Sequence, residues 1–148
     1  MKPVIQEEST GCAIACAAAI AGLTYREARR IANDLGIVAQ DAALWSETSY
    51  IRRLLGALGV GTGTAEIPFE QWGKLPDCAL LSIKWHEISG RPFWHWVVFA
   101  RDGNESYVLD SNQALKNNIR TDFGRMHPKW YIEVDNPRVF HRNTARIR

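Results

Sequence analysis

The first part of the chain carries apolar residues in the pattern of buried helices. The run from Gly11 to Ala21 consists of small or aliphatic residues, and Gly22 follows it directly. Alanine is the strongest helix former, and glycine is common just beyond a helix end. The pattern therefore predicts a buried helix over residues 11–21 whose neighbours approach closely.

Two further helices are predicted downstream. Thr24 and Glu27 form a capping box, in which each of the two side chains binds a free N–H group at the helix start. Apolar residues then recur at helical spacing until Gly36 ends the second helix. A third helix is expected over about 47–58, with Ser46 as its cap. Its apolar face comprises Ile51, Leu54, Leu55 and Leu58.

Beyond residue 60 the pattern changes to that of strands. Short apolar runs bounded by turn residues predict strands at 79–85, 94–100, 106–110 and 130–134. Asp102 and Gly103, between the second and third runs, are a hairpin signal. Helices followed by antiparallel strands are typical of an α+β fold, here with N-terminal helices packed on a C-terminal antiparallel sheet.

Length and composition narrow the classes of function. The 148 residues fit one domain, 1–148, which ends in a basic stretch at about 137–148. We interpret that stretch as a solvated tail, with a partner-binding arm as the alternative. The net charge of +2 is too small to indicate a nucleic-acid partner. Six tryptophans are many for this length, and we expect some of these amphipathic rings to line a groove.

The cysteines and the N-terminus indicate the compartment. Three cysteines are an odd number, and Cys12 and Cys16 are too close within one helix to pair, so we expect a reducing compartment. The N-terminus lacks the apolar core of a signal peptide, and the run 13–23 is too short to span a bilayer. We expect a soluble cytoplasmic protein without a membrane segment, or one exported by a route that needs no signal peptide.

Cys12 is the candidate nucleophile. It follows the polar stretch from Glu7 to Gly11, so it should lie in the first turn of the first helix. There the free backbone N–H groups and the positive end of the helix dipole favour a thiolate. A lone cysteine in an alanine-rich helix is more often a small buried apolar residue, and we interpret Cys16 in that way.

His95 and Asp110 are the candidate partners of Cys12. His95 begins a predicted strand, which would hold its side chain well enough for a general base. Antiparallel pairing across the turn near Gly103 should bring Asp110 beside His95 or Trp96. Asp110 would then hold the imidazole in the right tautomer; its alternative role is only to open a turn. The weaker candidates for the base are His86, His127 and His141.

The order of these residues resembles that of a known family. Gln6 precedes Cys12 by six positions, Leu75-Pro76 precedes a short strand, His95 is followed by an aromatic residue and two valines, and a strand ends in Asp110. From Val4 to about Asn112 this order resembles the bacteriocin-processing, double-glycine-leader peptidases, a branch of the papain-like cysteine peptidases. The chain differs from the usual family pattern in the residues that flank the nucleophile and follow the aspartate: Gly11, Ala13 and Ser111.

The resemblance implies a papain-like fold and a cysteine hydrolase that acts on a peptide or amide bond of a peptide or protein substrate, with no cofactor. It implies that Cys12 attacks and that His95 is its base. It further implies that Asp110 orients the imidazole and that Gln6 donates to the oxyanion, with the Cys12 backbone N–H as a second donor.

Three alternatives remain at this point. One keeps the thiol chemistry but changes the reaction to deamidation or another acyl transfer, which shares the same acyl-enzyme. A second is a peptide-binding module of the same fold without catalysis. A third is a metal site, although the cysteine spacing is not that of a usual zinc site. Its ligands would come from Cys12, Cys16, Cys78, His86 and His95.

Overall fold

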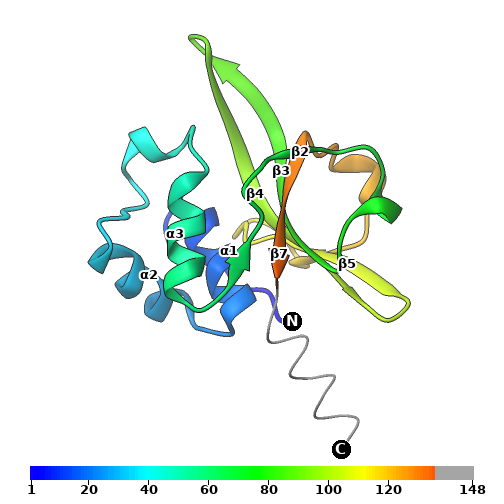
Figure 1. Ribbon diagram of the computed structural model, residues 1–148, viewed down its shortest axis with the longest axis horizontal. Helices are drawn as coiled ribbons and strands as arrows, with labels where there is room; N and C mark the ends of the chain where they lie inside the picture. The colour runs from blue at the N-terminus through cyan, green and yellow to red at the C-terminus, as the bar shows by residue number, and fades with distance from the viewer. Residues whose placement is uncertain (136–148) are drawn as a thin grey trace, which may run out of the picture.

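The computed structural model describes residues 1–135 and has an α+β fold, which confirms the predicted class (Figure 1). The α-helices are α1 (Cys12–Ala21), α2 (Tyr25–Asp34) and α3 (Ser49–Ala57). The strands are β1 (Gly61–Thr62), β2 (Ile67–Pro68), β3 (Cys78–Ile88), β4 (Arg91–Asp102), β5 (Glu105–Leu109), β6 (Ile119–Arg120) and β7 (Trp130–Asp135). Short 3₁₀ turns lie at Ala42–Leu44, Trp72–Lys74 and Phe123–Arg125. The basic tail expected at about 137–148 lies outside the described residues.

The first two helices form where the sequence predicts them. Gly22 ends α1 with φ of 75°, a conformation that glycine adopts without a steric penalty. The capping box of α2 is confirmed: the Glu27 N–H donates to Thr24 Oγ1 at 3.1 Å and the Thr24 N–H to Glu27 Oε1 at 2.9 Å. The prediction for α3 was wrong at its start, because α3 begins at Ser49, and its N-cap is Thr48 in place of Ser46.

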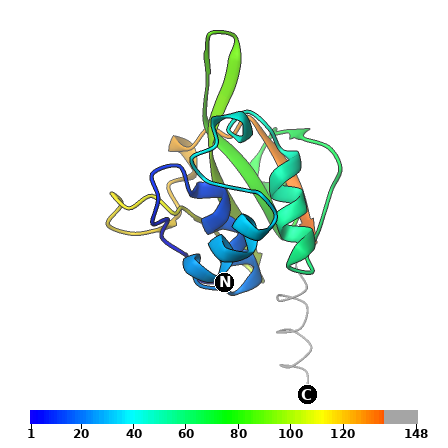
Figure 2. The same cartoon turned by 90° about the vertical axis from the view of Figure 1, so that its left-hand side faces the viewer.

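The strands form one antiparallel sheet in the order β1-β7-β3-β4-β5-β6, with β2 also paired to β7. The long hairpin of β3 and β4 occupies its centre and projects beyond the rest of the molecule (Figures 1 and 2). The pairing of β3 with β4 shifts between Ile83 and His86. The predicted hairpin between β4 and β5 is confirmed, with Gly103 at φ of 63° in its turn.

The core explains the composition of α1. Its residues from Ala13 to Ile20 are all buried, and they share one apolar cluster with sheet residues that include Leu80, Val98 and Ile132. Small side chains let this helix lie close to its neighbours at interior packing density. A second cluster contains strand residues that alternate with those of the first, among them Leu81, Val97 and Phe99, together with Leu75 and Met126 from outside the strands.

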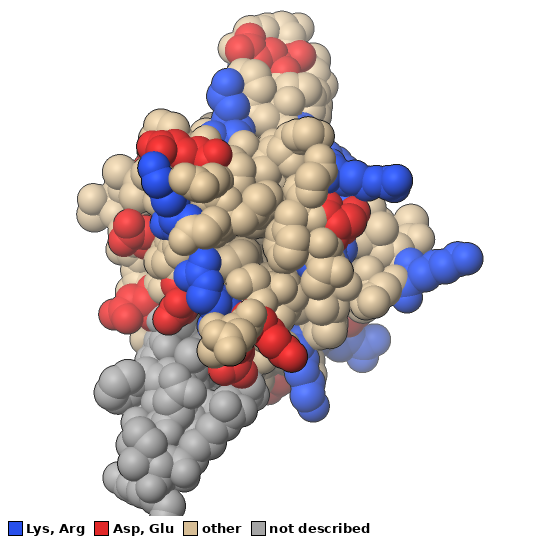
Figure 3. All heavy atoms as spheres, turned by 90° about the vertical axis from the view of Figure 1, so that its right-hand side faces the viewer, with Lys and Arg blue, Asp and Glu red and all other residues tan. Residues whose placement is uncertain are grey.

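The surface carries charges of both signs. On the face shown in Figure 3, Lys and Arg are interspersed with Asp and Glu over a largely uncharged surface. Within residues 1–135, none of the helices combines the length and the apolar character that crossing a bilayer requires.

Candidate active site

Cys12 is the first residue of α1, as expected. The N-cap, Gly11, supplies no side-chain hydrogen bond, and the first turn holds no acidic residue. The free N–H groups of this turn therefore remain available to an anion. Cys12 is partly exposed, whereas Cys16 and Cys78 are each 3% exposed.

Steric crowding explains why the residue before Cys12 is a glycine. A Cβ at position 11 would lie 2.1 Å from the Tyr25 hydroxyl, so the buried Tyr25 occupies the space that a side chain would need. That hydroxyl donates to a carboxylate oxygen of Glu8, and the other Glu8 oxygen accepts from Gln40 at 2.8 Å. The loop that leads into α1 is thus held by residues from α2 and from the segment that follows it. The sequence pattern contained no local signal for this network.

His95 and Asp110 are in direct contact. His95 Nε2 lies 2.7 Å from Asp110 Oδ1, and their side chains are 16% and 1% exposed. The ladder between β4 and β5 ends at Val98 with Leu109, so its continuation sets Asp110 opposite Val97. The expected pairing with His95 or Trp96 was wrong by one or two positions. Asp110 still reaches His95, because alternate residues of a strand share a face and diagonal neighbours lie within reach.

The environment of this pair favours its charged forms. Burial lowers the pKa of His95, but hydrogen bonds to Asp110 and to Cys12 outweigh burial and raise the pKa to about 9. Burial raises the pKa of Asp110, but its hydrogen bonds, first of all to His95, outweigh it and lower the pKa to about 2. At neutral pH the site therefore holds an imidazolium against a carboxylate. Since Nε2 binds Asp110, Nδ1 is the ring nitrogen left for Cys12.

Arg120 also binds Asp110 and was missed by the sequence analysis. Its Nη1 lies 2.9 Å from Asp110 Oδ2, while its Nε and Nη2 donate to the two oxygens of Asp122 at 2.9 and 2.8 Å. The backbone N–H of Asn112 donates to Asp110 Oδ1 at 3.1 Å. Arg120 lies on the two-residue strand β6, which is too short for any hydrophobic pattern to reveal.

Gln6 is buried and makes hydrogen bonds through all of its polar groups. Its Nε2 donates to the carbonyls of Glu8 and Ser9, each at 3.0 Å. Its Oε1 accepts from the Ser111 hydroxyl at 2.7 Å, and its backbone N–H donates to the Ser111 carbonyl at 3.0 Å. Both amide hydrogens of Gln6 are therefore engaged in the loop, and one must be released before Gln6 can donate to a substrate oxygen.

Ser111, one of the residues that differ from the usual pattern of the double-glycine-leader peptidases, has a structural role here. It follows Asp110 in the chain and holds Gln6 through both its hydroxyl and its carbonyl. Gln6 is thus bound to the chain neighbour of Asp110, and Asp110 is bound to His95, whose pKa is raised in part by Cys12.

The other histidines lie elsewhere. His86 is exposed near the tip of the β3–β4 hairpin, where its Nδ1 contacts the Lys84 carbonyl at 2.8 Å. His127 is exposed, and His141 is outside the described residues. Within residues 1–135 no three or more His, Cys, Asp or Glu side chains are grouped as a metal site would need.

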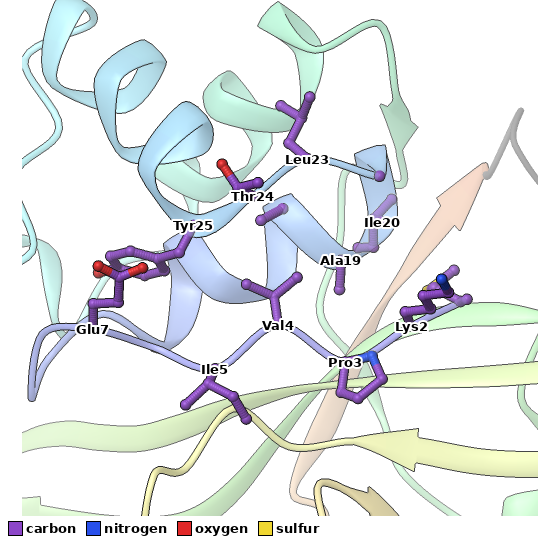
Figure 4. Close-up of a pocket in the computed structure, with 13 residues that line it drawn as sticks. Lys2, Pro3, Val4, Ile5, Glu7, Ala19, Ile20, Leu23, Thr24 and Tyr25 are labelled. Atoms are coloured by element: carbon purple, nitrogen blue, oxygen red, sulfur yellow. The ribbon is translucent and has the colours of Figure 1, made fainter.

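A cavity of about 690 Å³ lies between the N-terminal segment and the last turns of α1. In Figure 4, Val4 projects from that segment toward the helix, and Ala19 and Ile20 lie on the opposite wall. The α1 wall begins at Ala18, so at 1.5 Å per residue the cavity starts about 9 Å along the helix from Cys12. It is therefore separate from the site around the sulfur.

Solved structures with a similar fold include one of a peptidase. It is the crystal structure of a double glycine motif protease from an AMS/PCAT transporter, in complex with the leader peptide. The match has a TM-score of 0.58 and 14% sequence identity, and it covers 90% of this chain and 89% of that chain. No family model and no curated protein match the sequence. At this level of identity the likeness is one of fold.

Proposed function

We propose that this chain is a cysteine hydrolase with a papain-like fold, which cleaves a peptide or amide bond of a peptide or protein substrate. Cys12 is the nucleophile, His95 the general base and acid, Asp110 the residue that orients the imidazole, and Gln6 an oxyanion donor. The observation that carries the proposal is the 2.7 Å contact of the His95 ring with the buried Asp110 carboxylate, with Cys12 at the start of α1 close enough to help raise the pKa of His95. The fold likeness to a peptidase adds independent support.

The chemistry follows from the contacts. Asp110 holds Nε2–H, and the proton on Nδ1 is the one that the Cys12 thiol has given up to the imidazole. Cys12 therefore attacks the carbonyl carbon as a thiolate paired with the imidazolium. The Cys12 N–H and one Gln6 amide hydrogen, released from its loop carbonyl, stabilise the negative oxygen. The intermediate then collapses, the C–N bond breaks, and His95 returns the proton to the leaving amine. Water, deprotonated by His95, hydrolyses the thioester and frees Cys12.

We expect iodoacetamide at pH 7 to alkylate Cys12 at least about tenfold faster than Cys16 or Cys78. Cys12 is partly exposed beside an imidazolium, whereas burial raises the pKa of the Cys16 thiol and Cys78 is almost fully shielded. Peptide mass spectrometry after brief treatment measures the three rates. A Cys12→Ala variant is the control, and it should show only slow labelling. Equal rates at the three cysteines would exclude Cys12 as an activated nucleophile.

Gln6→Ala should lower kcat by about 10²–10³-fold, the usual effect of losing one oxyanion donor. Gln6→Glu should be at least as harmful, because a carboxylate repels the developing oxyanion. Ser111→Ala is the control, since it removes a partner of Gln6 Oε1 and leaves the donor in place. Cys12 alkylation in each variant checks that the loop is intact. Turnover of Gln6→Ala at the wild-type rate would limit Gln6 to bracing the loop.

The value of kcat/KM should fall as the pH rises through about 9. Although burial lowers the pKa of His95, its hydrogen bonds raise it from 6.5 to about 9, so the imidazolium persists through neutral pH and is lost only in alkaline solution. Initial rates measured from pH 6 to 10.5 give the profile. An alkaline fall centred below pH 7.5 would mean that His95 is not held by Asp110 as the geometry indicates.

A further inference from the structure

A second hollow is lined by Trp94, which like Cys12 packs against the apolar cluster around α1. Its volume is about 470 Å³, and it lies where the start of α3 meets β7 and the β3–β4 hairpin. Trp94, which directly precedes His95 on β4, forms part of its wall together with Trp85 and Trp130. Half of the six tryptophans therefore line one hollow, and one of them, Trp94, is the chain neighbour of the candidate catalytic histidine.

The aromatic wall favours a cation. The faces of indole rings carry negative electrostatic potential and attract ammonium and guanidinium groups. The chain itself supplies an example, because Lys129 Nζ lies 4.7 Å from the centre of the Trp85 ring. Trp94 and Trp130 pack edge to face with ring centres 5.0 Å apart, so these two walls of the hollow are in direct contact.

The charged residues that line the hollow are both acidic, Glu47 and Glu66. Glu66 already binds Arg52 Nη2 at 3.2 Å and the Thr48 hydroxyl at 2.9 Å. Glu47 is exposed, and its carboxylate has no ion-pair or hydrogen-bond partner among residues 1–135. Glu47 therefore brings to the hollow a carboxylate that is free to pair with a cationic ligand.

Two polar atoms of the wall have unfilled hydrogen-bonding capacity. Trp94 Nε1 and the Ser46 hydroxyl are shielded from solvent and have no hydrogen-bond partner within the described part of the chain. Both residues line this hollow. A buried polar atom without a partner is unfavourable, so a ligand that supplies an acceptor there gains from satisfying it.

We propose that this hollow is a substrate subsite for a basic side chain, lysine or arginine, of the peptide whose bond lies at Cys12. The aliphatic stem lies along the tryptophan rings, and the cationic head pairs with Glu47. A main-chain carbonyl of the same peptide accepts from Trp94 Nε1 once a small movement of the ring exposes that N–H. The assignment rests on the proposed function and adds the class of substrate to it.

The indole N–H signals of the ¹⁵N-labelled full chain test the subsite directly. We expect N-acetyl-arginine methylamide, N-acetyl-lysine methylamide or both to shift the signals of Trp85, Trp94 and Trp130 saturably. The citrulline analogue, which has the shape of arginine without its charge, should bind at least about threefold more weakly. The tighter of the two basic ligands identifies the preferred residue. Equal binding of citrulline, no saturable shift, or shifts confined to the other indoles would overturn the proposal.

A matched pair of variants tests the role of charge. Glu47→Gln should weaken binding of the basic ligand by about two- to fivefold, the range of an exposed ion pair. Glu105→Gln makes the same change at the exposed start of β5, beside the opposite end of β4 from the hollow, and should leave binding unchanged. Equal effects of the two variants would contradict a specific contact with Glu47. The titration does not involve Cys12, so failure of the subsite is distinguishable from failure of the alkylation test.

Discussion

His95→Ala should lower turnover by about 10⁴-fold or more, because it removes the group that takes the thiol proton and returns it to the leaving amine. Fold should be retained, since Asp110 keeps the Arg120 guanidinium at 2.9 Å as a partner for its charge. Cleavage of a peptide pool, followed by mass spectrometry, measures turnover. The rate of Cys12 alkylation at pH 7 gives a second measure that needs no substrate.

Two comparisons make the result specific to His95. His86→Ala removes an exposed histidine on the hairpin and should leave both rates unchanged. Combining Cys12→Ala with His95→Ala should be no more harmful than either change alone, since residues that act as one unit are not additive. If His95→Ala kept its rate of alkylation and of cleavage, Cys12 would have another base or none, and the hydrolase proposal would fail.

Asp110→Asn should lower turnover by at least about 10²-fold, toward the roughly 10⁴-fold loss that this change causes in a serine triad. The carboxylate receives three hydrogen bonds, from His95 and Asn112 at Oδ1 and from Arg120 at Oδ2. The asparagine side chain of this variant would have one oxygen and one NH₂ group in place of the two carboxylate oxygens. Whichever way this amide is turned, its NH₂ group meets a hydrogen-bond donor that the carboxylate had accepted from. Turned toward His95, that NH₂ forces the tautomer whose Nδ1 carries hydrogen and cannot accept the thiol proton.

The same change should move the alkaline fall of kcat/KM from about pH 9 to lower pH, because the hydrogen bond to Asp110 opposes burial in setting the pKa of His95. Asp122→Asn is the matched control. It removes the other carboxylate that binds Arg120 and does not touch His95. We expect near wild-type turnover and an unshifted profile for this variant. An unchanged rate in Asp110→Asn would reduce Asp110 to a turn residue.

The sequence by itself determined the features that depend on local interactions. The helix start at Cys12, the capping box of Thr24 and Glu27, and the hairpin at Gly103 all rest on neighbours within a few positions in the chain. Hydrophobic period and turn chemistry carry such information directly. For the same reason the approach of Asp110 to His95 could be predicted, although the register was one or two positions away from the one observed.

Only the tertiary structure decided which groups surround those residues. Arg120 beside Asp110, Ser111 on Gln6, and Tyr25 in the space above Gly11 are contacts between segments that are distant in the chain or too short to show a pattern. Likewise, the engagement of both Gln6 amide hydrogens and the gathering of three tryptophans around one hollow arise from packing. A polar side chain finds its partner only when the core brings separate elements together, so local pattern cannot specify it.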